Sequence, residues 1–209
     1  MTMPDSSTIS PDTIVAFISD ILERRGADSY LGEAVTMSEH MLQGAQLAEQ
    51  AGANDDLVAA ALLHDIGHYT NEFPENAMEK GTDNRHEEAG AAVIAPYFPA
   101  LVTDCVRWHV DAKRYLCATD PQYFDRLSAA SVHTLKLQGG PMSDEEVAAF
   151  RKQPHLDAII QVRKWDEAGK VPSTPTPPSR TTHRCCSGSS TGTRRSDAET
   201  RIETRISTP

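Results

Sequence analysis

The sequence predicts an all-α domain, a bundle of six to eight helices, followed by a tail that has no core of its own. Apolar residues recur at helical spacing in successive segments, and no segment shows the apolar–polar alternation of a half-buried strand. After Val171 the chain becomes rich in Pro, Ser, Thr and Arg and loses its bulky apolar residues. We therefore expect a flexible N-terminus (1–10), one helical domain (11–172) and a disordered tail (173–209).

The first four helices are predicted from their apolar stripes and their end signals. Glycines stop the first two, Asn54 is suited to cap the third, and Pro96 halts the fourth. The segments are residues 13–26, 33–52, 54–68 and 85–94.

The second half of the domain continues the same pattern. Ser143 and Glu146 form the signature of a capping box, and Gly169 follows the last apolar stripe. The segments are residues 99–116, 125–140, 143–153 and 155–170.

The stretch "LLHDIGH" (residues 62–68) places metal-capable side chains at the end of a buried helix. If the helix continues, His64 and His68 are four residues apart and share one face, with Asp65 beside them. Polar groups at the edge of a core are costly unless something coordinates them. Taken alone, the motif is also compatible with a helix end that carries two solvent-facing histidines.

Four other predicted helices each carry one more histidine or aspartate within an apolar stretch. These residues are His40, His86, His109 and Asp166. Imidazole and carboxylate ligands suit iron, manganese, zinc or nickel better than a soft cluster or magnesium alone. The recurrence of such residues on separate helices favours a metal site over several independent buried polar groups.

The order His … His-Asp … His … His … Asp resembles the HD-domain superfamily of helical metal-dependent enzymes, between about Ser29 and Asp166. The resemblance implies two metal positions. The first would be held by His40, His64, Asp65 and Asp166, and the second by Asp65, His86 and His109. Asp65 would bridge the two ions.

Most enzymes of this superfamily are phosphohydrolases, whereas a smaller branch uses two irons to activate oxygen. Tyr30 and Glu33, shortly before His40, resemble a pair in the oxygenases that cleave carbon–phosphorus bonds. There the tyrosine and glutamate form a lid, and the glutamate caps the second iron until substrate displaces it. We expect the oxygenase. The alternatives are an HD-type phosphohydrolase that acts on a nucleotide or phosphate ester, and a non-catalytic binding module.

A phosphonate pocket is implied by the same resemblance. His68 would contact the phosphonate, Lys113 follows His109 by four residues, and Arg163 precedes Asp166 by three. Ser131 would complete the set of substrate-binding residues. Lysine supplies charge, and arginine supplies a planar fork of donors for the phosphonate oxygens.

The implied cofactors are two iron ions in a mixed-valent Fe(II)/Fe(III) pair, with O2 as co-substrate. The implied substrate is a 1-hydroxy-2-aminoethylphosphonate, with a free or an N-trimethylated amine, cleaved to phosphate and glycine or glycine betaine. The sequence does not decide between the two amines, and we slightly favour the free one.

Charge and composition limit the possible partners. The chain has a net charge of −10, but residues 1–172 hold 14 basic and 27 acidic residues, whereas the tail holds six arginines and three acids. An acidic domain lacks the basic surface that nucleic acids require. The sequence carries no transmembrane stretch and no signal peptide, so we expect a cytoplasmic monomer that binds neither nucleic acid nor membrane.

Overall fold

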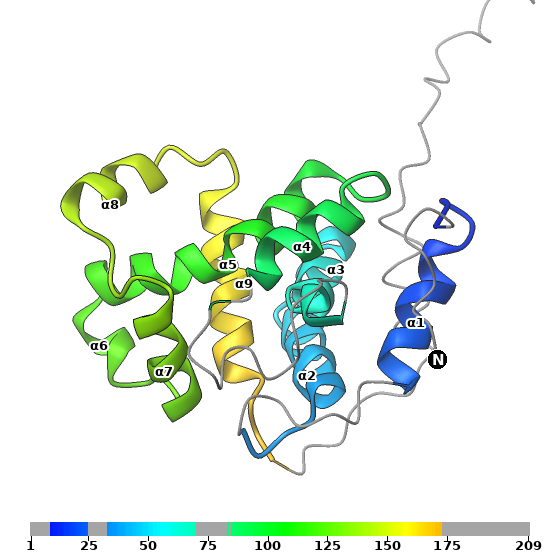
Figure 1. The fold of residues 1–209 in the computed structure, drawn as a ribbon, viewed down its shortest axis with the longest axis horizontal. Helices are drawn as coiled ribbons and strands as arrows, with labels where there is room; N and C mark the ends of the chain where they lie inside the picture. The colour runs from blue at the N-terminus through cyan, green and yellow to red at the C-terminus, as the bar shows by residue number, and fades with distance from the viewer. Residues whose placement is uncertain (1–8, 25–32, 70–82, 84, 173–209) are drawn as a thin grey trace, which may run out of the picture.

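A computed structural model describes residues 9–24, 33–69, 83 and 85–172 of the chain (Figure 1). Within these residues the regular elements are nine α-helices and one 3-10 helix, and there is no strand. They are α1 (Ile14–Arg24), α2 (Met37–Gln50), α3 (Asp55–Leu63), η2 (Ile66–Tyr69), α4 (His86–Ile94), α5 (Ala100–Thr119), α6 (Pro121–Phe124), α7 (Ala129–Leu137), α8 (Asp144–Phe150) and α9 (Leu156–Ala168).

The all-α prediction is confirmed, and each of the eight predicted segments matches one of these α-helices, although α5 continues to Thr119, three residues past its predicted end. The count exceeds the predicted six to eight because of α6, a single turn that Asp120 caps and Pro121 begins. A turn this short has no apolar periodicity that a sequence can reveal.

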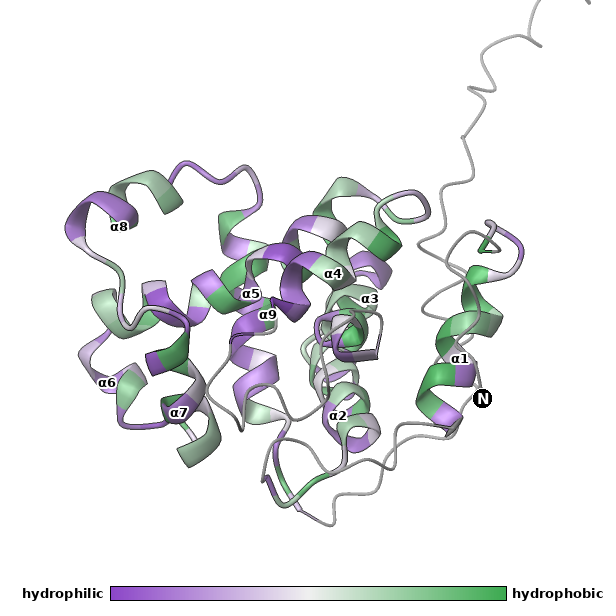
Figure 2. Cartoon of the chain, viewed as in Figure 1, coloured by the Kyte–Doolittle hydropathy of each residue, from purple (hydrophilic) through white to green (hydrophobic). Residues whose placement is uncertain are grey.

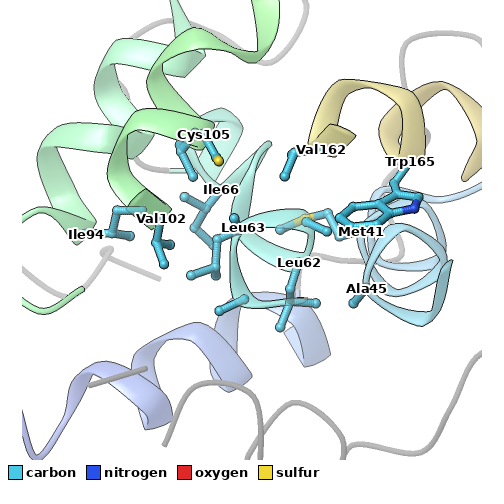
Figure 3. Close-up of a cluster of buried hydrophobic side chains, with 14 of the residues drawn as sticks. Met41, Ala45, Leu62, Leu63, Ile66, Ile94, Val102, Cys105, Val162 and Trp165 are labelled. Carbon is cyan, nitrogen blue, oxygen red and sulfur yellow. The ribbon is translucent and has the colours of Figure 1, made fainter. Parts of the chain in front are cut away.

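Helix α3 lies at the centre of the bundle and contacts α2, α5 and α9 (Figures 1 and 3). It is buried on every side from Val58 to Leu63, which suits a helix that is apolar all round. Leu62 and Leu63 contribute to a core that also includes Met41 of α2 and Trp165 of α9. Three alanines, at positions 59 to 61, keep α3 narrow enough for its neighbours to approach.

Helix α1 and helices α6, α7 and α8 lie at opposite ends of the molecule in Figure 1. Helix α1 is mostly hydrophobic (Figure 2) and buries Ile14, Ile18 and Ile21 in the core. None of the helices in the described part of the chain has both the length and the apolar character needed to cross a membrane.

The two ends of the chain lie largely outside the described residues. The predicted flexible N-terminus falls there for residues 1–8, whereas Ile9 packs against the core and its carbonyl accepts a hydrogen bond from the Tyr97 hydroxyl at 2.8 Å. The predicted disordered tail (173–209) lies wholly outside the described residues.

Side-chain caps set several helix boundaries. The predicted caps Asn54 and Ser143 both accept a hydrogen bond from the backbone of their helices, and Ser143 forms the predicted capping box with Glu146. A second capping box, between Thr36 and Glu39, starts α2 at Met37 rather than near Glu33. The segment that carries Glu33 is therefore a loop that leads into α2.

The prediction that His64 and His68 share one α-helix is wrong. Helix α3 ends at Leu63, His64 is its C-cap, and the chain tightens into the 3-10 helix η2 at Ile66. This change of helix brings Gly67 against α4: a Cβ built on Gly67 would lie 1.8 Å from the His86 carbonyl oxygen and 2.6 Å from the Gly90 nitrogen. Only glycine fits at this crossing.

We predict that Gly67→Ala lowers the free energy of unfolding by about 3 kcal/mol or more, because backbone atoms of α4 have to move to admit the methyl group. The control is Gly44→Ala, where the nearest atom to the new Cβ is the Ala61 carbonyl oxygen at 3.3 Å. Chemical denaturation of both variants measures the difference. Equal losses in the two variants would contradict the importance of the Gly67 contact.

Candidate metal centre and adjoining pocket

Six metal-capable side chains meet at the centre of the bundle. Each is at most 4% exposed, and together they come from five parts of the chain. They are His40 of α2, His64 and Asp65 after α3, His86 at the start of α4, His109 of α5, and Asp166 of α9. The structure thus brings together all six residues that the sequence predicted on the apolar faces.

The first cluster consists of His40, His64, Asp65 and Asp166. The Nε2 atoms of the two histidines lie 3.0 Å apart. Asp65 Oδ2 lies 3.5 Å from His40 Nε2 and 3.4 Å from His64 Nε2. Asp166 Oδ1 lies 3.4 Å and 3.8 Å from the same two nitrogens. Four donor atoms therefore face one small volume.

The second cluster consists of His86, His109 and the other oxygen of Asp65. The two Nε2 atoms lie 3.0 Å apart, and Asp65 Oδ1 lies 3.3 Å from His86 and 3.4 Å from His109. Because Oδ1 faces this cluster while Oδ2 faces the first, the single carboxylate of Asp65 joins the two. This is the geometry of a bridging ligand.

Backbone carbonyls orient three of the four histidines. The Nδ1 atoms of His40, His64 and His109 donate to the carbonyls of Gly169, Ala61 and Val106 at 3.0, 2.8 and 2.7 Å. A proton on Nδ1 leaves a lone pair on Nε2 that points into the cluster, as in metal-binding histidines. Two facing lone pairs repel each other unless a cation or a proton lies between them.

His86 is oriented differently, because its Nδ1 faces a carboxylate. Glu87 Oε2 lies 3.6 Å from this nitrogen. Burial raises the pKa of the Glu87 carboxyl, and the neighbouring His86 opposes that rise. A carboxylate behind a metal-binding imidazole increases the basicity of the ring.

The electrostatics of the first cluster suit a cation. Burial lowers the pKa of His40, but its contacts with the Asp166 and Asp65 carboxylates outweigh burial and raise the pKa to about 9. Asp65 Oδ2 and Asp166 Oδ1 are buried and have no hydrogen-bond partner among the described residues. Buried carboxylate oxygens are costly without a partner, so the donor set fits a metal ion at this position.

His68 lies beside the second cluster. Its ring stacks on that of His86, with centroids 4.1 Å apart and planes 18° apart. Burial, and then the charge of His86, hold the pKa of His68 well below its usual range. Ligand atoms of Asp65, His68 and His86 all lie within 4.8 Å of one another, so geometry permits either a metal ligand or a substrate contact here.

A pocket adjoins the second cluster, and its lining contains every predicted substrate-binding residue together with Glu33. The predicted residues are His68, Lys113, Ser131 and Arg163. Metal-capable residues of both clusters also border the pocket, namely Asp65, His86, His109 and Asp166. Groups able to bind an anion therefore lie directly beside groups able to bind metal.

The cations of this pocket are buried and held in place. Lys113 is 4% exposed and donates to the Thr134 hydroxyl at 2.8 Å. Burial, and then the charge of Arg163, lower the pKa of Lys113 to about 7. Arg163 is ion-paired with Asp166 and Glu167, and its Nε donates to the Tyr123 hydroxyl at 2.7 Å.

Sequence reasoning missed three further polar residues of the pocket, namely Thr134, Gln138 and Lys170. Thr134 lies one helical turn after Ser131, and Lys170 lies four residues after Asp166, just past α9. The Lys170 ammonium donates to the Ser131 hydroxyl at 2.7 Å. Helical spacing from the predicted site residues could have identified all three, since Gln138 lies seven residues after Ser131, but a lysine at a helix end is usually a solvated charge.

Of the predicted lid pair, Glu33 lies among the described residues and Tyr30 does not. Glu33 lines the pocket, where its carboxylate accepts a hydrogen bond from the Ser128 hydroxyl and lies 3.5 Å from Lys170 Nζ. Tyr30 lies outside the described residues, so its predicted role as a lid is not tested.

Comparison with known proteins gives consistent matches. The family model described as "HD domain" matches residues 37–150. The chain is 58% identical over 177 residues to the [1-hydroxy-2-(trimethylamino)ethyl]phosphonate dioxygenase (glycine-betaine-forming) of Leisingera caerulea, covering 85% of this chain and 90% of the relative. It is 40% identical over 163 residues to the hydroxymethylphosphonate dioxygenase of Gimesia maris, covering 78% of this chain and 81% of the relative.

We predict that Asp65→Asn abolishes metal binding at both clusters, because each cluster loses one oxygen of the shared carboxylate. Asp166→Asn should remove only the ion of the first cluster. Elemental analysis of purified protein after metal loading measures the content, which should fall from about two ions per chain to none and to about one, respectively.

Asp104→Asn is the matched control, because Asp104 pairs with His155 away from both clusters. This variant should keep the full metal content. An Asp65→Asn protein that still folds and retains both ions would contradict a bridging role for Asp65.

Proposed function

The chain belongs to the HD domain family, and we propose that it is an O2-dependent diiron oxygenase that cleaves the carbon–phosphorus bond of a hydroxylated aminoethylphosphonate. The observation that carries the proposal is the pocket beside the second cluster, where buried Lys113 and Arg163 lie next to metal-capable residues and Glu33. The names of both relatives support it, since each is a phosphonate dioxygenase.

We assign the first iron to His40, His64, Asp65 and Asp166, and the second to Asp65, His86 and His109. The two oxygens of Asp65, which face different histidine pairs, support this assignment. Glu33 is proposed as the displaceable carboxylate of the second iron. A mixed-valent Fe(II)/Fe(III) pair, when bound, supplies the activation of oxygen and the oxidising power for the reaction.

The remaining residues bind and orient the substrate. Arg163 offers a planar fork of donors, Lys113 a point charge, and Ser131 and His68 further polar contacts for the phosphonate oxygens. Since Tyr123 and Glu167 hold Arg163, and Thr134 holds Lys113, before substrate arrives, these two cations lose little conformational entropy on binding. Holding the phosphonate would place the adjacent carbon, C1, on the side of the pocket that His86 and His109 border. Tyr30 is proposed to close the pocket against water.

We propose the N-trimethylated substrate and glycine betaine as the product, rather than the free amine that the sequence slightly favoured. The 58% identical relative is named for a substrate with a trimethylamino group, and this supports the choice. Aromatic rings often bind quaternary ammonium groups. Among the described residues that line the pocket, histidines are the only ones with aromatic rings. Trp108 and Tyr115 pack on Phe150 instead. The choice of the trimethylated substrate therefore depends on the relative and not on an aromatic cage.

We also propose that the domain extends over residues 11–172, beyond the 37–150 that the family model matches. Helices α1 and α9 lie wholly outside that match, yet both bury residues in the common core. Helix α9 in addition carries Asp166 and Arg163. A protein trimmed to the matched region would therefore lack part of both the core and the site.

Product analysis tests the proposed reaction. Iron-loaded protein is incubated with three phosphonates in turn, namely the N-trimethylated substrate, its free-amine analogue and hydroxymethylphosphonate, with and without oxygen. We expect oxygen-dependent release of phosphate and glycine betaine from the first compound, at a rate at least about tenfold above the other two.

The phosphohydrolase alternative makes the opposite prediction. A hydrolase releases phosphate without oxygen and cleaves a simple ester such as p-nitrophenyl phosphate. Oxygen-independent phosphate release, or hydrolysis of that ester at a comparable rate, would overturn the oxygenase.

We predict that the affinity for the phosphonate falls as the pH rises through about 7, because binding needs the charged Lys113. Below its pKa of about 7 the ammonium is already present, whereas above it each binding event takes up a proton. The affinity should then fall by up to about tenfold per pH unit. Calorimetry without oxygen, in buffers of different ionisation enthalpy, measures both the affinity for the phosphonate and the number of protons taken up on binding.

Lys113→Arg is the control for this dependence, because a guanidinium keeps its charge throughout the range. The substrate and the metal site titrate in the same way in the wild type and in Lys113→Arg. A difference between their plots of affinity against pH is therefore due to the proton of Lys113. Lys113→Met should bind weakly at every pH. Identical profiles for the wild type and Lys113→Arg would exclude a role for the Lys113 proton.

A further inference from the structure

The carboxylate of Glu33 is held by two residues, Ser128 and Lys170. It accepts a hydrogen bond from the Ser128 hydroxyl and lies 3.5 Å from Lys170 Nζ. These contacts are sheltered from solvent, since the Glu33 side chain is 14% exposed and that of Lys170 is 8% exposed. An ion pair at this depth is screened less than a surface pair.

The N-terminus of α7 adds to this environment. Ser128 is the N-cap of this nine-residue helix, and its hydroxyl oxygen accepts a hydrogen bond from the Ser131 backbone at 3.1 Å. The same hydroxyl donates its proton to Glu33. The glutamate is therefore linked, through the capping serine, to the positive end of a helix dipole.

Both partners keep other contacts if Glu33 leaves. Lys170 Nζ donates to the Ser131 hydroxyl at 2.7 Å and lies 3.3 Å from Glu167 Oε2. The Ser128 backbone donates to Glu167 Oε1 at 2.8 Å, and its hydroxyl still caps α7. If Glu33 moves away, Lys170 and Ser128 therefore still have hydrogen-bond partners. The movement of Glu33 leaves no buried charge unpaired, so its cost in free energy is small.

We infer that Ser128 and Lys170 form a seat for the displaced Glu33 carboxylate, which holds it away from the second metal position while substrate occupies that position. This inference rests on the proposed function, in which Glu33 is a displaceable ligand. Ser128 and Lys170 are then positioning residues. They favour substrate binding by stabilising the displaced form of Glu33, not by touching the reacting atoms.

A double-mutant cycle between Lys170→Met and Glu33→Gln tests the seat. Without Lys170, Glu33 spends more time at the second metal position. The second Mn²⁺ ion should therefore bind about fivefold more tightly, and the KM for the phosphonate should rise by a similar factor with less change in kcat. In the Glu33→Gln background, Lys170→Met should change neither quantity. Titration with Mn²⁺ and steady-state kinetics provide the two measurements.

Two further variants complete the experiment. Ser128→Ala should shift both quantities in the same direction as Lys170→Met, since it removes the other contact of the seat. The exposed Lys164, on the neighbouring helix α9, gives the control variant Lys164→Met, which should leave both the Mn²⁺ affinity and the KM unchanged. If Lys170→Met destabilises the fold, Lys170→Gln keeps a polar group for the same cycle.

The outcomes separate the seat from other roles. An effect of Lys170→Met that persists in the Glu33→Gln background would mean that Lys170 acts on substrate or structure directly, and would overturn the inference. An unchanged Mn²⁺ affinity in Lys170→Met would do the same. The Mn²⁺ measurement needs no turnover, so it remains valid if the protein fails to release phosphate from any phosphonate, which would refute the proposed function alone.

Discussion

One buried carboxylate, that of Asp65, is shared between two pairs of histidines, and the arrangement of the bundle follows from this sharing. Each oxygen lies within 3.5 Å of two imidazole nitrogens, so four helix segments have to reach the same point from different directions. The end of α3 can supply that point only if α3 is central. A central helix has to be apolar all round and narrow, which explains the alanines and leucines before the histidine.

The second constraint is the contact between Gly67 and α4. The tight 3-10 turn after α3 carries the chain against the start of α4, where His86 is the first helical residue. The position of one histidine pair relative to the other thus depends on backbone atoms in direct contact.

The acidic domain also concentrates cations locally. Lys113, Arg163 and Lys170 border the same pocket, and carboxylates from α9 contact Arg163 and Lys170.

Much of the fold and of the candidate metal centre could be predicted from the sequence, because polar residues are conspicuous within apolar helical stripes. His40, His109 and Asp166 were found in this way, and caps such as Ser143 marked helix starts. The end of α3 at Leu63 could not be predicted, since helical spacing continues through the histidines and only the contact with α4 requires the change. Lys170 and Thr134 were missed because their burial depends on how α7 packs against α9. The seat of Glu33 depends on the same packing.

The histidines of only one cluster border the pocket, although Asp65 and Asp166 border it too, and this asymmetry has a kinetic consequence. His86 and His109 border the pocket, whereas His40 and His64 do not and are fully buried. An ion bound by His86 and His109 would exchange with solution through the pocket, whereas an ion bound by His40 and His64 would reach the pocket only past the carboxylates of Asp65 and Asp166. Chelators and competing metals would therefore act on the second ion long before the first. Acquisition of the first ion would then belong to the maturation of the protein rather than to its catalytic cycle.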